Sequence, residues 1–270
     1  MIYKIFHTAD WQYILNKKQP FDYALKAYLK DVKTHTDKFE QYEDVLQIIV
    51  GDIFENIHDL VKIDEFLAVK DMLTKMTELS PVVMVGGNHD NKKDNAIDAN
   101  DNLLKIVNNW DIYGLKYIKH SEVYETQNVR LMNYSIYNQS KPPKDYKQYL
   151  DGDKFNIGLY HDPLNCAIDY GGKTFKTSPS LKIFDGLDAV MMGDIHKRQA
   201  FEFNKDKYAV YCGSPYQRRV SESINEHGYV LWDLYDKEIS FNFVDIDNPF
   251  TIVKADYDYD NKTLDIKNKI

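Results

Sequence analysis

The sequence predicts an α/β fold in which two β-sheets pack face to face and are flanked by helices. Three observations support this. First, apolar strand-like runs alternate with helical segments up to about residue 115. Second, the strand-like runs after residue 115 have few helical segments between them. Third, polar side chains stand directly after five of the apolar runs. A chain of 270 residues, 43% of them hydrophobic, is long enough to bury one large core.

The first part of the chain alternates between two periodicities. Strands are predicted over 2–10, 45–52 and 81–90, and helices over 21–38, 61–79 and 96–110. In the first helix, Phe21, Leu25, Tyr28 and Val32 share one face. This β-α-β-α-β-α order implies parallel strands joined by right-handed crossovers. Chemistry in such sheets lies beyond the carboxyl ends of the strands.

After residue 115 the pattern changes to short strands. The segments are LKYIK, SEVYET, VRLMNYSIY, FNIGLYHD, LDAVMMGDIH, AFEFN, YAVYCGSPYQ, GYVLWDLY and ISFNFVDI. The paired prolines of NQSKPPKDYK, residues 138–147, predict a loop. We expect one domain over residues 1–247 and a short C-terminal extension over 248–270.

Composition excludes some classes of protein. The mean hydropathy is -0.54, no apolar run is long enough for a membrane span, and the N-terminus lacks a signal-peptide pattern, so we expect a cytoplasmic protein without membrane contact. Cys166 and Cys212 form no CxxC pair, which argues against a thiolate zinc site. The net charge of -8 argues against a protein that binds along nucleic acid through its overall charge. Acidic residues that surround a cation site would account for this charge, and so would acidic residues that only keep the protein soluble.

Polar side chains that can bind metal ions follow five apolar runs. They are Asp10 and Gln12; Asp52; Asn88 and His89; His161; and Asp194 and His196. Singly, Asp52 could cap a helix, Asn88 could occupy a turn and His161 could be an ordinary hydrogen-bonded histidine. Together they predict a metal site of oxygen and nitrogen donors, which suits Mn²⁺, Fe²⁺ or Zn²⁺. A metal pair needs a bridging carboxylate, and Asp52, alone on its strand end, is the candidate.

These residues resemble a known family. The set HTADWQ, GDIFEN, GGNHD, LYHDP and GDIH is similar to the D-x-H, G-D-x-x-[DN], G-N-H-[DE], lone-His and G-H-x-H signatures of the calcineurin-like metallophosphoesterases. Within that superfamily, HTADW, GDIFE and the YCGSPYQ that follows GDIHKRQ resemble the nuclease subunit of SbcCD-type repair and recombination complexes, including short phage-type forms.

The resemblance implies a four-layer α/β/β/α fold and a two-metal phosphodiester hydrolase. The first metal would take Asp10, Gln12, Asp52 and His196, and the second Asp52, Asn88, His161 and Asp194. His89 would lie beside the scissile phosphate, where it would stabilise charge or protonate the leaving oxygen. By the same resemblance, Asp90 and Glu55 are expected to orient loops rather than bind metal.

Two positions depart from the family pattern. Gln12 and Asp194 stand where the family has histidines. Oxygen donors in place of imidazoles make the site harder, which favours Mn²⁺, with Mg²⁺ as the second choice, over Zn²⁺. Gln12 is a neutral, weak ligand, so the first metal is expected to bind less tightly. The rival interpretation is a site that is losing activity.

The expected activity is that of a double-strand DNA exo- or endonuclease in recombination, repair or replication. Lys197, Arg198, Arg218 and Arg219 are predicted to contact DNA phosphates. By resemblance, the partners are double-stranded DNA ends, an SMC-like ABC ATPase, and a second copy docked through helices 21–38 and 61–79. Residues 248–270 would be the remnant of a capping region. A small-substrate phosphatase or phosphodiesterase, and a weakened DNA-end binding subunit, remain as alternatives.

Overall fold

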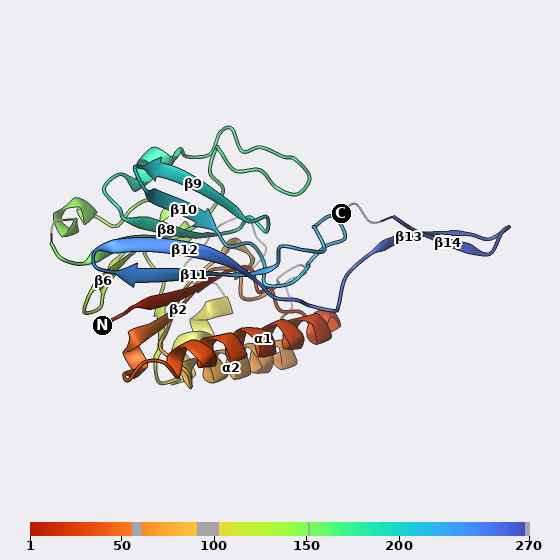
Figure 1. Ribbon diagram of the computed structural model, residues 1–270, viewed down its shortest axis with the longest axis horizontal. Coiled ribbons are helices and arrows are strands. Elements are labelled where there is room, and N and C mark those ends of the chain that lie inside the picture. Colours follow the sequence, from red (N-terminus) through yellow and green to blue (C-terminus); the bar gives the residue numbers. More distant parts are fainter. Residues whose placement is uncertain (56–60, 91–102, 151, 268–270) are drawn as a thin grey trace.

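Two six-stranded sheets form the centre of the computed structural model shown in Figure 1, which describes residues 1–55, 61–90, 103–150 and 152–267. The first sheet has the order β12-β11-β1-β2-β3-β4, and the second has the order β5-β6-β7-β8-β10-β9. The predicted sandwich is confirmed.

Among the described residues, no helix combines the length and apolar character that a bilayer crossing requires.

The first sheet contains the three strands predicted in the N-terminal part. β1 (Lys4–Thr8), β2 (Val45–Val50), β3 (Val82–Val85) and β4 (Leu115–Ile118) run parallel, and β11 (Gly228–Tyr235) and β12 (Glu238–Asp245) add an antiparallel edge. Helices α1 (Lys18–Thr36) and α2 (Ile63–Thr77) cover its outer face (Figure 1). α1 begins three residues before the predicted 21–38 and contains Pro20 in its first turn, a position that tolerates proline.

The second sheet is built from the strands predicted after residue 115. β6 (Val129–Tyr134), β7 (Phe155–His161), β8 (Ala189–Gly193) and β10 (Lys207–Tyr211) run parallel, and β5 (Val123–Glu125) and β9 (Gln199–Asn204) are antiparallel edges. Its outer face packs against loops and short 3-10 helices, including η7 (Leu181–Phe184). In the part of the chain that is described, no α-helix covers this face.

Three apolar clusters hold the layers together. The one between the sheets contains Ile48, Val83, Leu159 and Met191, all buried. A second lies between the first sheet and its helices, and a third lies on the outer face of the second sheet. Burial of each such side chain contributes about 1.5–3 kcal/mol to the free energy of folding, before the loss of conformational entropy is subtracted. The apolar cluster between the sheets therefore fixes their relative position.

Two elements differ from the sequence-based prediction. The α-helix expected over 96–110 lies partly outside the described residues, and its described part is the 3-10 helix η4 (Leu103–Asn109). The remaining 3-10 helices in the described residues are η1 (Leu15–Lys17), η2 (Tyr42–Asp44), η3 (Asn88–Asp90), η5 (Ile136–Asn138) and η6 (Tyr146–Tyr149). The last two overlap the two ends of the loop predicted over 138–147, and its middle is free of helices and strands.

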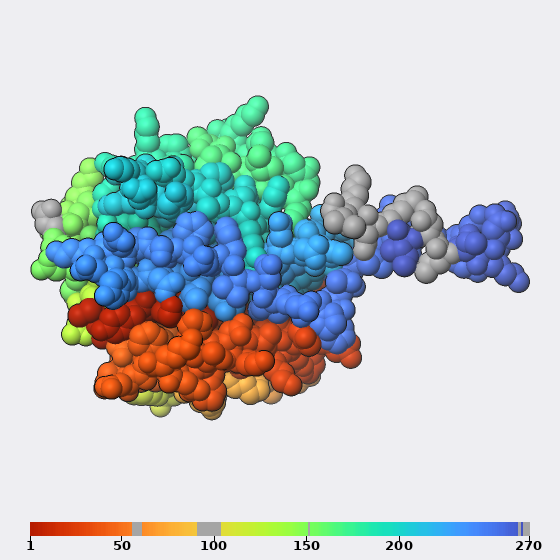
Figure 2. All heavy atoms as spheres, in the orientation of Figure 1, coloured from red at the N-terminus to blue at the C-terminus, as the bar shows by residue number. Residues whose placement is uncertain are grey.

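The C-terminal extension begins against the body of the protein and then leaves it. The Asn248 side chain donates a hydrogen bond to the Pro20 carbonyl, and Gln217 and Ile252 exchange two hydrogen bonds. Strands β13 (Lys254–Asp258) and β14 (Thr263–Lys267) then form a hairpin that projects away from the sandwich (Figures 1 and 2). The division at residue 247 stays a prediction.

Candidate metal centre

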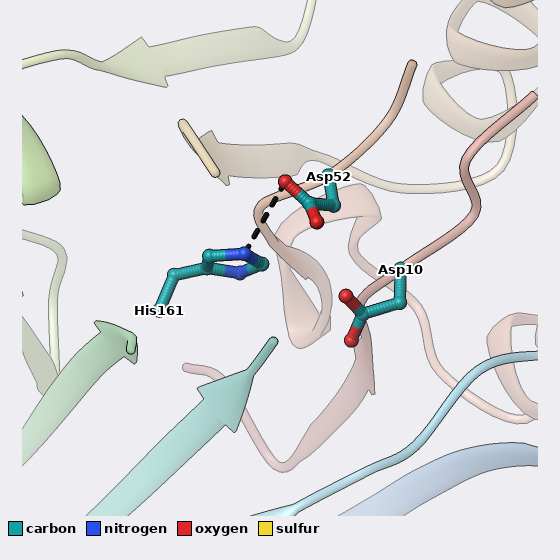
Figure 3. A group of neighbouring side chains, drawn as sticks. All are labelled: Asp10, Asp52 and His161. Carbon is teal, nitrogen blue, oxygen red and sulfur yellow. Dashed lines mark ion pairs between the residues drawn. The ribbon is translucent and has the colours of Figure 1, made fainter. Parts of the chain in front are cut away.

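Three buried side chains from both sheets meet at the carboxyl ends of their strands. Asp10 follows β1, Asp52 follows β2 and His161 ends β7. One ligand atom from each lies within 4.8 Å of the others. Figure 3 shows the three side chains pointing toward one another. The strand ends that the sequence marked with polar residues therefore come together in space.

The loops that carry these residues adopt a strained backbone. Asp10, Gln12, Asp52 and Asp194 have φ values of 53°, 40°, 53° and 82°, in the left-handed region that non-glycine residues rarely adopt. Such strain costs about 1–3 kcal/mol per residue and persists where the surrounding structure enforces it, typically at functional sites. The backbone N–H groups of Asp10 and Gln12 donate to the carbonyls of Gly51 and Asp52, which ties the first two loops together.

Asp90 fixes the loop that carries Asp52. Its carboxylate accepts hydrogen bonds of 2.9–3.1 Å from the backbone N–H groups of Asp52, Ile53, Phe54 and Gly87. The prediction that Asp90 orients loops is confirmed. Burial raises the pKa of Asp90 to about 7.

His161 is held as a metal-binding histidine usually is. Its Nδ1 donates to the Val50 carbonyl at 2.6 Å, which directs Nε2 toward Asn88 Oδ1 at 3.1 Å and Asp52 Oδ1 at 3.3 Å. Burial lowers the pKa of His161, but the Asp52 carboxylate outweighs burial and holds it well above the usual range. Two oxygen acceptors thus lie beside the Nε2 of His161, and with it they could bind a cation.

His196 has a comparable partner on the other side of the site. Its Nδ1 donates to Glu222 Oε1 at 2.7 Å, and its Nε2 lies 3.8 Å from Asp10 Oδ1. Asp194, two residues earlier, donates its backbone N–H to Asp10 Oδ2 at 3.1 Å. Glu222 was missed by the sequence analysis, because it belongs to no motif and follows no apolar strand.

The residues fit divalent cations. Asp10 Oδ1 is buried and accepts no hydrogen bond among the described residues. Burial raises the pKa of Asp10 to about 7 and that of Asp194 to about 6, so these carboxylates lack the solvation that their charged forms need. A bound cation would supply it. Asp52 lies in the middle of the set, with Oδ1 toward His161 and Oδ2 toward Gln12, as a bridging carboxylate would.

Glycine is required beside the site. A Cβ on Gly87 would lie 2.7 Å from His161 Nε2 and closer still to Asp52 Oδ1. The glycine of the GGNHD motif therefore leaves the space in which these two side chains meet.

His89 lies at the opening of the site. Its backbone N–H donates to Asp52 Oδ1 at 2.8 Å, and its Nδ1 is 3.3 Å from Glu55 Oε1. Burial lowers the pKa of His89, but the Glu55, Asp52 and Asp10 carboxylates together outweigh burial and raise it to about 9. The ring is therefore protonated at neutral pH and can donate a proton. Glu55 thus contacts the ring of His89, whereas the sequence analysis expected it to orient a loop.

His89 borders a pocket of about 260 Å³ above the metal ligands. The lining includes Gln12, Asp52, Asp194 and His196 from the predicted set, the cations Lys197 and Arg219, and the aromatic side chains Tyr170 and Phe175. The two aromatic residues were missed by the sequence analysis, because their segment, 163–180, has neither a motif nor a clear periodicity.

Two of the four predicted DNA-contacting cations are engaged inside the protein. Arg218 is only 2% exposed and binds Glu55, Gln12 and Tyr216. Arg198 binds the Asp245 carboxylate and donates to the Val244 carbonyl at 2.7 Å. Their guanidinium groups are already held by partners in the fold, which argues against contact with DNA phosphates, and that contact stays a prediction. For Lys197 and Arg219, the prediction of contact with DNA phosphates is unchanged.

The fold and the site define a class of protein, the metal-dependent phosphoesterases. The profile of the calcineurin-like phosphoesterases matches residues 3–198, and the chain belongs to that family. This agrees with the resemblance found in the sequence and with the hydrolase activity that it implies.

Individual similar proteins share only a low sequence identity with the chain. An uncharacterized protein of Acanthamoeba polyphaga mimivirus is 25% identical in an alignment of 246 positions that covers 83% of this chain and 18% of the viral protein. The chain thus spans less than a fifth of that relative's length. A dimetal phosphatase from Danio rerio has a similar structure, with a TM-score of 0.52 and 13% identity over 89% of this chain and 95% of that one. A 5'-nucleotidase from Candida albicans has a TM-score of 0.50 and 11% identity, over 90% and 52% of the two chains.

Proposed function

We propose that the protein is a metal-dependent phosphodiesterase that cleaves DNA at duplex ends. The observation that carries this proposal is the composition of the pocket around His89. Two cations, Lys197 and Arg219, and two aromatic side chains, Tyr170 and Phe175, border the same opening as the predicted metal ligands. Cations that contact flanking phosphates and rings that contact bases are the features with which proteins bind nucleic-acid strands.

The chain's own residues account for the proton that the leaving group needs. Divalent cations on the predicted ligands would polarise the scissile phosphate and lower the pKa of an attacking water. His89 is protonated at neutral pH and lies at the mouth of the site, so it donates a proton to the departing oxygen. Glu55 orients the His89 ring, and Arg218 holds Glu55 through a 2.6 Å ion pair.

A phosphatase acting on a small substrate is the second candidate. A pocket of about 260 Å³ is near the lower end of the range for small-molecule pockets, and the structural neighbours are a dimetal phosphatase and a 5'-nucleotidase. Lys197 and Arg219 would then bind the substrate's single phosphate group rather than a strand.

The experiment that tests the proposal compares two substrates. End-labelled duplex DNA and a nucleoside monophosphate are incubated with the protein and Mn²⁺, with Mg²⁺ and Zn²⁺ in parallel. His89→Ala should lower DNA cleavage about 10²–10⁴-fold, as expected for a general acid. His120→Ala, an exposed histidine away from the site, is the matched control.

Each result has a definite meaning. Cleavage of DNA by the wild type but not by His89→Ala supports the nuclease. Hydrolysis of the monophosphate alone favours the phosphatase. DNA binding without hydrolysis in any of the three metals favours a weakened DNA-end binding subunit.

We also propose that two copies of the chain dock through the first-sheet helices. Ile63 and Leu67, one turn apart on α2, are 77% and 58% exposed, and adjacent exposed apolar side chains are a candidate contact surface for a second copy. Sedimentation should show a dimer that the Ile63→Asp, Leu67→Asp variant loses. A monomeric wild type at micromolar concentration contradicts this.

An SMC-like ATPase partner rests on the sequence resemblance. It predicts that addition of such a subunit with ATP stimulates cleavage of blocked DNA ends. Cleavage that is unchanged by the subunit and ATP contradicts it.

A further inference from the structure

Gln12 occupies the position at which the family pattern has a metal-binding histidine, and its amide is held by two partners. Its Nε2 is 3.1 Å from Asp52 Oδ2, and its Oε1 is 3.3 Å from Arg218 Nε. A guanidinium can only donate hydrogen bonds, and a carboxylate can only accept them. The two partners therefore fix the orientation of the amide: the carbonyl oxygen faces Arg218, and the NH₂ group faces Asp52.

Arg218 cannot readily move away from Gln12. Its Nη2 donates to Glu55 Oε2 at 2.6 Å, and its Nη1 donates to the Tyr216 hydroxyl at 2.5 Å. Its backbone N–H donates to Glu222 Oε2 at 2.6 Å. The planar guanidinium thus binds three side chains at once, in a geometry that a lysine could not reproduce.

Coordination of a metal by Gln12 would disrupt these contacts. The only good ligand atom of the side chain is Oε1, which would have to turn away from Arg218 and toward the metal. The amide NH₂ would then face the Arg218 Nε–H, and the amide oxygen would face the Asp52 carboxylate. The pair of donors at Arg218 is repulsive and buried, and a buried donor that loses its acceptor is strongly unfavourable.

Asp52 is affected as well. Its Oδ2, the oxygen nearer the first metal position, already accepts the hydrogen bond from Gln12, and its Oδ1 accepts the backbone N–H of His89. The buried positive charge of Arg218 adds repulsion toward a cation on that side. On the opposite side, formed by Asp10, Asp52 and His161, the described contacts include the hydrogen bonds of His161 Nε2 and the His89 N–H but no arginine.

We propose that Gln12 is a positioning residue for Asp52 rather than a metal ligand, and that the chain binds one divalent cation tightly, on Asp10, Asp52 and His161. A second cation, on the His196 side, binds about 100-fold more weakly, as expected if it must compete with these hydrogen bonds. The inference deepens the phosphodiesterase proposal, because it sets the metal content of the same site.

The test is a titration of metal-free, full-length protein with MnCl₂, followed by calorimetry and by electron paramagnetic resonance. The wild type should show one tight site per chain and the six-line signal of an isolated Mn²⁺ ion at one equivalent. Gln12→His supplies the imidazole that the family pattern has and should tighten the second site at least tenfold, giving a spin-coupled signal at two equivalents. Gln148→His, which adds an exposed histidine elsewhere, should behave as the wild type does.

Gln12→Met tests whether Gln12 is a metal ligand without introducing an imidazole. It keeps the proposal testable if the Gln12→His variant does not fold. Met retains the length of the side chain but removes both the amide oxygen and the amide NH₂. If Gln12 is not a ligand, the affinity of the second site should not fall, and it should rise because Asp52 Oδ2 no longer accepts the hydrogen bond from Gln12. A loss of tenfold or more overturns the proposal.

The remaining outcomes separate this inference from the proposed function. Two equally tight sites in the wild type, with a spin-coupled signal, overturn the inference and leave the phosphodiesterase proposal standing. No Mn²⁺ binding at micromolar concentration overturns both.

Discussion

The Glu222 carboxylate accepts a 2.7 Å hydrogen bond from the His196 imidazole and, through its other oxygen, a 2.6 Å hydrogen bond from the backbone of Arg218. It thereby orients one predicted ligand and fixes the arginine that holds Gln12. A carboxylate behind a ligating histidine raises the ligand's basicity and locks its tautomer.

Glu222→Gln should therefore weaken Mn²⁺ binding on the His196 side and lower hydrolysis, each by about 10–100-fold. The measurements are a metal titration and a rate assay at saturating substrate. Glu226→Gln, an exposed neighbour on the same loop, is the control and should change neither. Equal behaviour of the two variants would show that the Glu222–His196 contact does not matter.

Metal binding should stabilise the fold, because a cation would compensate buried carboxylates such as Asp10. Mn²⁺ at about 100 times its dissociation constant should add about 2.7 kcal/mol to the free energy of unfolding. For a chain of this size that is a rise in Tm of roughly 5–10 °C, reversed by a chelator. Scanning calorimetry with and without Mn²⁺ measures it, and Asp52→Asn should lose most of the shift. A Tm that does not respond to Mn²⁺ would count against the metal centre.

The aromatic residues of the pocket should discriminate between substrates. Tyr170→Ala and Phe175→Ala should each raise KM for duplex DNA about tenfold, within the range found for base–aromatic stacking. The effect on hydrolysis of bis(p-nitrophenyl) phosphate should be smaller, because its nitrophenyl rings offer less area for stacking than bases do. Tyr259→Ala, 84% exposed on the projecting hairpin, is the control. An equal loss on both substrates would indicate that the loop is needed for the site as a whole.

His7 should make the protein sensitive to acid. It is fully buried on β1, and burial lowers its pKa from 6.5 to about 3. The unfolded chain therefore takes up the proton first, and stability is lost as the pH falls below 6.5. At pH 5 the loss relative to pH 7.5 is about 2 kcal/mol.

Urea unfolding at several pH values checks this, with His7→Leu as the comparison. The variant's stability should fall less steeply between pH 7 and pH 5, because the group that titrates is gone. Parallel curves for the two proteins would refute the role given to His7.

The main elements and the centre of the site were predictable from the sequence because each has a local signal. Asp52 and His161 follow unbroken apolar runs, and parallel strands bring such positions to one edge of the sandwich. The 3-10 helix at Leu103–Asn109 was not predictable, since apolar spacing alone does not distinguish it from an α-helix.

The environment of the arginines was also not predictable. Arg218 and Arg219 are adjacent and identical in type, yet one is buried and the other exposed. The difference lies in partners far away in the sequence, Glu55 and Gln12, which only the folded chain brings near. Glu222 was missed for the same reason, because nothing in its own neighbourhood distinguishes it from a surface glutamate.

The origin of the candidate ligands has a kinetic consequence. Asp10 and Asp52 belong to the first sheet and His161 to the second, and the two sheets adhere through an apolar cluster. An ion bound to all three would cross-link the two halves of the sandwich. Parting the sheets, a step on the way to the unfolded chain, would then first require release of the ion. We therefore expect bound metal mainly to slow the unfolding rate and so to lengthen survival under proteolysis, with a smaller effect on the refolding rate.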